Sequence, residues 1–178
     1  THIIGSDTTV TDYCGNVIYE NGIPVKLLTE AGYVTLADSK YHYFVQDHLG
    51  NNRVVVDQSG NVEEVNHYYP FGGLLSSSVS NAVQPYKYNG KELDRKNGLD
   101  WYDYGARMYD AALGRWHAVD PMSEKYYSIS SYVYGLNTPH NCIDPDGQKI
   151  IFVNGYLGFG SPRGGGTYWG GVNSSFVK

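Results

Sequence analysis

Short apolar runs separated by turn-forming residues extend through the first half of the chain. Residues 41–45 and 62–69 are rich in aromatic and β-branched side chains, which favour strands because they pack well on a pleated surface. The second run ends at 70–73, where Pro lacks a backbone donor and Gly bends the chain. A further strand is predicted at 86–88. The pattern therefore predicts many short strands and few helices.

A turn followed by an apolar run recurs at residues 12–19, 47–56 and 58–65. Each copy contains a Gly-Asn pair, which supplies a hairpin turn between two strands. The spacing of the copies is irregular, so the repeat is degenerate. One such unit cannot bury its apolar face alone, and stacking against neighbouring units would bury it.

The aromatic segment 101–116 predicts a β-hairpin that turns at 111–114, since Gly105 and Gly114 lower its helix propensity. One short helix is predicted at 128–136, ended by the Asn-Thr-Pro run that follows it. The fold class expected from these elements is mainly β, with one or two short helices.

The composition changes after Gly147. Residues 149–153 form a clean apolar strand pattern, and 155–178 are mostly Gly, Ser and aromatic residues with few charges. We therefore expect three regions: degenerate β repeats at 1–85, a second β region at 86–148, and a separate segment at 149–178. The first residue is Thr, and no signal peptide is visible, which suggests a piece of a longer polypeptide.

The amino-acid composition argues against several classes of function. Tyr is unusually frequent, at 18 of 178 residues, and Gly reaches 22, which fits strands joined by tight turns. The net charge of −5 and the dispersed Lys and Arg argue against nucleic-acid binding. The His and Cys residues lack metal-ligand spacing, so no metal or cofactor is expected. No apolar run of about 18 residues predicts a membrane span.

Two Asp-Pro pairs and Arg107 are the candidates for chemistry. Asp120 precedes Pro121 and Asp144 precedes Pro145, and Pro forces the residue before it into extended backbone. Two carboxylates held close together share a proton, which provides an acid and a base for peptide hydrolysis. However, Asp-Pro is also a common turn opener, and an Arg often forms a salt bridge or stacks on an aromatic ring. Spacing alone favours two turns over a catalytic pair.

Several motifs resemble the Rhs repeat-associated core of YD-repeat polymorphic toxins and of the C component of insecticidal toxin complexes. They are YNGKELD at 88–94, GLDWYDYGARMYD at 98–110, GRWHAVDP at 114–121 and NTPHNCIDPDG at 137–147. Residues 43–51, YFVQDHLGN, resemble the last YD-type repeat that leads into this core. The resemblance covers about residues 41–147.

The resemblance implies a spiralling β-sheet that forms a hollow shell around a C-terminal toxin. In several relatives the core is an aspartyl self-protease that cuts just after its Asp-Pro-x-Gly end. The family's arginine and two aspartates match Arg107, Asp120 and Asp144. The motif around the second aspartate continues as Pro145-Asp146-Gly147, which places the expected cut between Gln148 and Lys149. Self-cleaving relatives usually carry Leu where this chain has Gln148.

The implied partners are the chain's own C-terminal toxin region, upstream shell repeats, a cognate immunity protein and a secretion machinery. The implied location is secreted or on a bacterial cell surface. Two alternatives stay open at this point: a single-turnover aspartyl autoprotease, and a shell or cell-surface YD-repeat module without proteolysis.

Overall fold

The computed structural model describes residues 2–4, 7–76, 78, 84–95 and 98–153. Short antiparallel strands are the main regular structure of the described residues, and the described helical elements are single 3-10 turns. The N-terminal strands β1 (His2–Ile4) and β2 (Asp7–Thr9) form a separate hairpin. The mainly β fold class expected from the sequence is confirmed.

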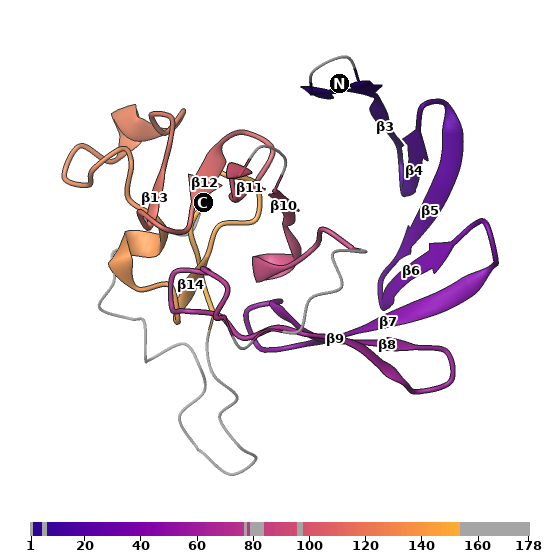
Figure 1. Ribbon diagram of the computed structural model, residues 1–178. Coiled ribbons are helices and arrows are strands. Elements are labelled where there is room, and N and C mark those ends of the chain that lie inside the picture. The colour runs from indigo at the N-terminus through magenta and orange to yellow at the C-terminus, as the bar shows by residue number, and fades with distance from the viewer. Residues whose placement is uncertain (1, 5–6, 77, 79–83, 96–97, 154–178) are drawn as a thin grey trace, which may run out of the picture.

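A seven-stranded meander forms the larger sheet, in which each strand pairs with the next along the chain. The sheet is strongly curved, and β8 and β9 extend under the second half of the molecule (Figure 1). Its strands are β3 (Thr11–Cys14), β4 (Val17–Glu20), β5 (Ile23–Thr29), β6 (Gly32–Thr35), β7 (Lys40–Gln46), β8 (Asn52–Asp57) and β9 (Val62–Val65).

Two of the predicted repeat turns share one geometry. Asp47 Oδ1 accepts hydrogen bonds from the backbone N–H groups of Leu49 and Asn51, at 3.0 and 3.1 Å. Asp57 Oδ1 does the same for Ser59 and Asn61, both at 2.8 Å. The glycine of each turn, Gly50 and Gly60, has a positive φ, which explains why Gly is placed there. The hairpins predicted at these Gly-Asn pairs are therefore confirmed.

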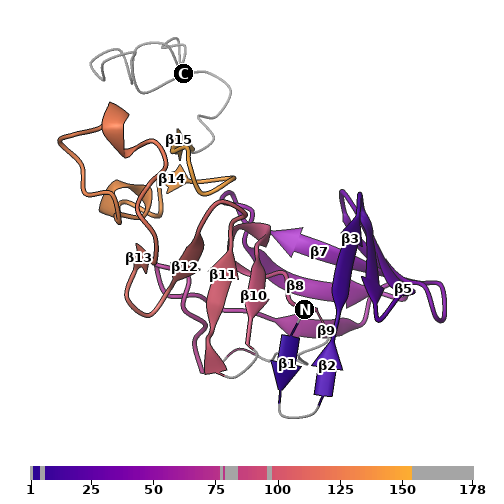
Figure 2. The ribbon, with the colours of Figure 1, turned by 90° about the horizontal axis from the view of Figure 1, so that it is seen from above.

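The second half contains a four-stranded antiparallel sheet and a small hairpin. Figure 2 shows the four strands side by side next to the larger sheet, with the hairpin farther out. The sheet consists of β10 (Glu92–Asp94), β11 (Trp101–Asp103), β12 (Met108–Asp110) and β13 (Arg115–Trp116). The hairpin consists of β14 (Cys142–Ile143) and β15 (Ile151–Phe152), and three 3-10 turns complete the region: η1 (Tyr88–Gly90), η3 (Ser123–Lys125) and η4 (Gly135–Asn137).

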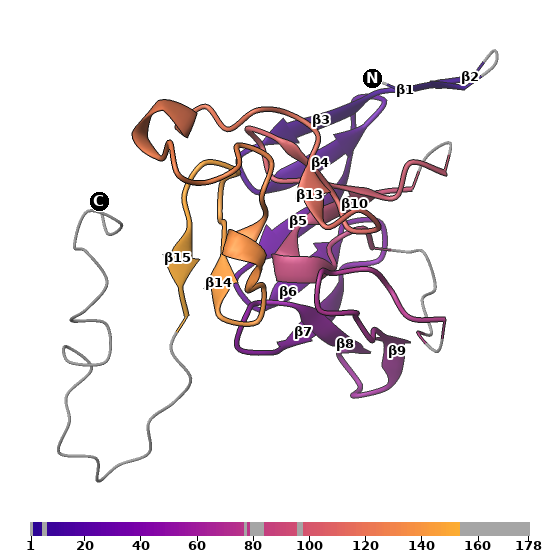
Figure 3. The same cartoon turned by 90° about the vertical axis from the view of Figure 1, so that its left-hand side faces the viewer.

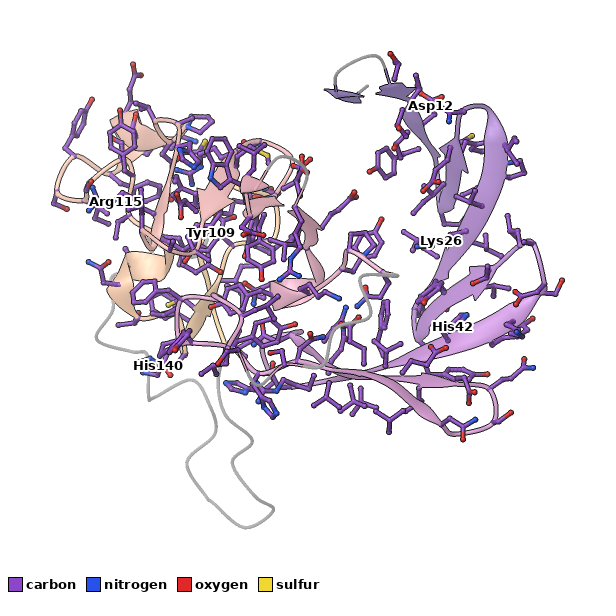
Figure 4. The ribbon with its side chains drawn as sticks, viewed as in Figure 1. Asp12, Lys26, His42, Tyr109, Arg115 and His140 are labelled. Carbon is purple, nitrogen blue, oxygen red and sulfur yellow. The ribbon has the colours of Figure 1, made fainter. Side chains whose placement is uncertain are left out.

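Aromatic side chains form the core of this second half. The view with side chains shows Tyr109, a residue of β12, inside a dense group of side chains (Figure 4). The buried members of this core are Tyr88, Leu93, Tyr102, Tyr104, Tyr109, Trp116 and Tyr134. Burial raises the pKa of these phenols, to about 12 for Tyr88, so they stay protonated and donate hydrogen bonds.

Three tyrosine hydroxyls of this core hold one turn. Those of Tyr88, Tyr102 and Tyr109 donate to the carbonyl oxygens of residues 70, 72 and 71, at 3.0, 2.9 and 2.8 Å respectively. The Pro-Phe-Gly turn after the last strand of the larger sheet is thereby fixed against the smaller sheet.

Asn89 joins the two halves. It adopts a positive φ of 49°, which Asn tolerates better than most residues. Its Nδ2 donates to the carbonyl of Leu49 at 2.9 Å, and its Oδ1 accepts from the hydroxyls of Tyr104 and Tyr134 at 2.8 and 2.6 Å. The half-buried amide of Asn89 therefore links the repeat region to the aromatic core.

Several sequence expectations need correction. The helix predicted at 128–136 is wrong: within it lie bends and an isolated bridge between Val133 and Arg115, and only η4 begins at its end. The strand predicted at 86–88 is reduced to a bridge between Tyr86 and Glu92, because η1 starts at Tyr88. The hairpin predicted at 101–116 turns at 111–114 as expected, since β12 and β13 pair across this turn, but the segment contains a third strand, β11, which pairs with β12 across a second turn.

Two further expectations concern the ends of predicted segments. The strand predicted at 62–69 is shorter, because β9 ends at Val65 and only a bridge between Tyr68 and Leu74 follows. The strand predicted at 149–153 is present as the two-residue β15. The segment 154–178 lies outside the described residues. No described helix is long and apolar enough to cross a membrane.

Candidate functional site

Arg107 lies at the centre of the site, directly before β12, and only 4% of its surface is exposed. Its Nε donates to the carbonyl of Gly147 at 2.6 Å, and its Nη1 donates to the carbonyl of Ser131 at 3.2 Å. The guanidinium also lies over the Trp116 ring, 4.2 Å from the ring centroid. These contacts fix a buried cation in a single orientation.

Both candidate aspartates bind the same nitrogen of this arginine. Arg107 Nη2 lies 3.0 Å from Asp120 Oδ2 and 3.4 Å from Asp144 Oδ2. The structure therefore brings together the three residues that the sequence singled out, although 24 positions separate the two aspartates. Burial lowers the pKa of Arg107, while the two carboxylates oppose this effect.

Asp120 combines this contact with a turn. Its Oδ1 accepts from the backbone N–H of Met122 at 2.7 Å, across Pro121. Its own N–H donates to the carbonyl of Ser131 at 3.0 Å. This Asp-Pro pair therefore forms both a turn and an ion pair, because Asp120 Oδ1 binds the Met122 N–H and Asp120 Oδ2 binds Arg107.

Asp144 is the more deeply buried carboxylate, with 1% of its side chain exposed. Its Oδ1 accepts from four successive backbone N–H groups, at 3.3, 2.8, 3.1 and 3.2 Å; the donors are Asp146, Gly147, Gln148 and Lys149. Burial raises the pKa of Asp144, and these N–H groups and Arg107 oppose the rise. A carboxyl with a raised pKa retains a proton more readily than an ordinary aspartate.

The backbone of residues 147–149 is held from both sides. Asp144 binds the N–H groups on either side of Gln148, and Arg107 binds the carbonyl of Gly147. Gly147 has a φ of +76°, and a Cβ there would lie 3.1 Å from the backbone nitrogen of Arg107. Only glycine fits this position without displacing the arginine.

A small pocket adjoins the site. Asp120 and Gln148 form part of its wall. The apolar side chains that line it are Ile129, Val133, Ile150 and Phe152. Beyond the pocket β15 pairs with β14, and the N–H of Val153 donates to the carbonyl of Asn141 at 2.7 Å. Figure 3 shows β14 and β15 side by side at the edge of the molecule.

The sequence analysis did not identify two groups that contact Arg107, a backbone carbonyl and an aromatic ring. The carbonyl of Ser131 accepts from both Arg107 and Asp120, and Trp116 supplies the ring beneath the guanidinium. A backbone carbonyl has no sequence signature. Trp116 lies in β13, close to Asp120 in the chain, but nothing in the sequence pairs its ring with Arg107.

The comparisons with known proteins fit this architecture. A family model described as Teneurin YD-shell matches residues 29–139. The chain belongs to the teneurin YD-shell family.

Relatives of this YD-shell chain include surface and toxin proteins. It is 38% identical over 135 residues to the salivary gland surface protein 1 of Aedes aegypti, covering 70% of this chain and 4% of that protein. It is 36% identical over 100 residues to the toxin subunit YenC2 of Yersinia entomophaga, covering 54% of this chain and 10% of the relative.

Solved structures show the same fold. The crystal structure of TcdB2-TccC3-TEV superposes with a TM-score of 0.64 at 22% identity, over 78% of this chain. This chain spans 8% of that structure and a tenth or less of the two relatives named above. It therefore corresponds to a small part of much longer YD-shell proteins.

Proposed function

We propose that this segment closes a YD shell around a C-terminal polypeptide and frees that polypeptide by cutting its own Gln148–Lys149 bond. One observation carries the proposal: Asp144 accepts a hydrogen bond from the Lys149 N–H while sharing Arg107 Nη2 with Asp120. Two carboxylates next to one peptide bond form the minimal apparatus for acid–base hydrolysis.

The roles follow from the environments of the two aspartates. Asp120 is the more exposed, with 18% of its side chain accessible, and acts as the base that takes a proton from water. The hydroxide formed attacks the carbonyl carbon of Gln148. Asp144, whose raised pKa favours the protonated form, delivers its proton to the Lys149 nitrogen as the C–N bond breaks. The products are a carboxylate at Gln148 and an amine at Lys149.

Arg107 is a positioning residue in this scheme. Its bond to the Gly147 carbonyl fixes the peptide preceding the cut, and its charge opposes the burial-driven rise in the pKa of Asp144. Gln148 lines the apolar pocket beside Asp120, where Leu, usual in self-cleaving relatives, would bury more apolar surface. We therefore expect cleavage that is slower than with Leu at this position.

The relatives support the assignment to a toxin shell. YenC2 is a toxin subunit by name, and the fold matches that of TccC3-containing structures. The partners proposed are the polypeptide that starts at Lys149, the shell repeats upstream, a cognate immunity protein and a secretion machinery. The proposed location is extracellular, either secreted or on the cell surface.

The test is expression of residues 1–178 with a C-terminal tag, alongside Asp120→Asn and Asp144→Asn. We expect the wild-type chain to split into two fragments whose intact masses place the new carboxyl terminus at Gln148, whereas both variants stay whole. Asp38→Asn is the matched control, because Asp38 pairs with Lys40 at the surface, away from the Arg107 network, and should still allow cleavage. Identical uncut chains in all four samples would refute self-cleavage.

A non-catalytic shell module is the alternative function. It is favoured by the four N–H groups that satisfy Asp144 Oδ1, an arrangement that stabilises a turn without any reaction. Under this alternative the chain folds and remains uncut, and Asp144→Asn lowers only its melting temperature.

A further inference from the structure

A second buried polar cluster lies away from the Arg107 site, where the end of β9 meets the segment before η1. Its members are almost inaccessible to solvent: Glu64 and Lys87 are each 2% exposed and Asn66 is 0% exposed. Gln84, also 2% exposed, completes the group. Such residues are rarely buried without a structural or chemical role.

One carboxylate oxygen joins the members of this cluster. Glu64 Oε1 accepts from Lys87 Nζ and from Asn66 Nδ2. The lysine and asparagine nitrogens therefore lie within two hydrogen-bond lengths of each other, at most about 6 Å. Asn66 Nδ2 also donates to the carbonyl of Asn52 at 3.1 Å, which holds its amide in place.

Lys87 is almost fully buried, which is unusual for an ammonium group. Burial lowers the pKa of Lys87, while Glu64 opposes this effect. Proton transfer from the ammonium to Glu64 gives a neutral amine, which is a nucleophile, next to a carboxylic acid. Among the described residues, Asn66 Oδ1 and Gln84 Oε1 are buried acceptors without a hydrogen-bond partner. The asparagine amide is thus buried, positioned and incompletely satisfied.

We propose that Lys87 and Asn66 form an intramolecular isopeptide bond, with Glu64 carrying the proton. Lys87 Nζ attacks the Asn66 side-chain carbonyl carbon after its proton has passed to Glu64. Glu64 then returns a proton to Asn66 Nδ2 and takes the second proton from Nζ, the C–N bond breaks, and ammonia leaves. One amide replaces another, so no oxidant or other co-reactant is needed.

Gln84 is the competing electrophile, since its Nε2 also donates to Glu64 Oε1, at 3.0 Å. Asn66 is favoured because its amide nitrogen is bound by two acceptors, Glu64 and the Asn52 carbonyl, which fix its orientation. A Lys87–Asn66 bond also connects the end of the larger sheet covalently to the segment that leads into the aromatic core. This would strengthen a shell wall at the junction between its two halves.

Mass spectrometry of the denatured chain, either whole or as the fragment that ends at Gln148, tests the bond directly. We expect a mass lower than that of the sequence by about 17 Da, the mass of ammonia. Residues 54–86 contain no Lys or Arg, so trypsin should yield the peptide 54–91, uncut after the acylated Lys87, in place of 54–87. Backbone fragment ions between residues 66 and 87 should be absent, because that stretch is closed in a ring.

Variants assign the roles. Lys87→Arg and Glu64→Gln should restore the full sequence mass, whereas Gln84→Met should keep the loss, because Gln84 supplies no atom to the bond. A wild-type chain of unmodified mass, or a ring that ends at Gln84, would overturn the proposal. The wild-type measurement decides even if a variant fails to fold. It is also independent of self-cleavage, since Asn66 and Lys87 both precede Gln148.

Discussion

Replacing Arg107 by Met is expected to destabilise the fold strongly. The change removes the contacts to the Gly147 and Ser131 carbonyls and both carboxylate pairs, and leaves Asp144 buried without a cation. Breaking a buried ion pair by removing one partner costs about 3–5 kcal/mol. Met fills most of the same volume, so the loss reports on charge and hydrogen bonding rather than on a cavity.

Urea unfolding followed by tryptophan fluorescence measures this change. Arg115→Met is the matched control, because Arg115 is exposed and lies at the periphery of the aromatic group (Figure 4). The control should change the unfolding free energy by less than about 0.5 kcal/mol. A loss below about 1 kcal/mol for Arg107→Met would refute the idea that the arginine holds the site together.

The same variant has a predictable pH dependence. The pKa of Asp144 is raised in the folded state, so its contribution to stability is present below its unfolded value and is lost as pH rises through the folded value. Without Arg107 the folded pKa rises further, and the loss at neutral pH becomes larger. The difference between wild type and Arg107→Met should therefore be smaller near pH 4 than near pH 7, and an equal difference at both would contradict this account.

Three further substitutions test the site and the contacts that hold it in place. Gly147→Ala should lower the unfolding free energy by about 1–3 kcal/mol, measured by urea titration, because its φ of +76° and the 3.1 Å approach to Arg107 both oppose a Cβ. Asn89→Ala should cost about 2–4 kcal/mol, since it removes the acceptor of two buried tyrosine hydroxyls, and an unchanged melting temperature would count against this. Gln148→Leu should speed the appearance of the cut fragment on a timed gel, and a slower rate would argue against an apolar pocket for this residue.

The sequence by itself determined the local structure. Val, Ile and aromatic runs favour strands, and the Asp-x-x-Gly-Asn turns at 47–51 and 57–61 are specified by their own residues, because the side chain of the Asp bonds to N–H groups two and four positions later. The three polar residues of the site were also identifiable in the sequence. Local chemistry of this kind needs no distant partner, which is why the pattern predicts it.

Only the tertiary structure decided which distant groups meet. The 128–136 segment has a helical pattern, yet the pairing of Val133 with Arg115 and the bonds to the Ser131 carbonyl hold it in bends. Likewise, the contact of Glu64 with Lys87 arises because the end of β9 packs against the segment before η1. Burial then lowers the pKa of Lys87, and burial depends on the whole fold rather than on neighbours along the chain.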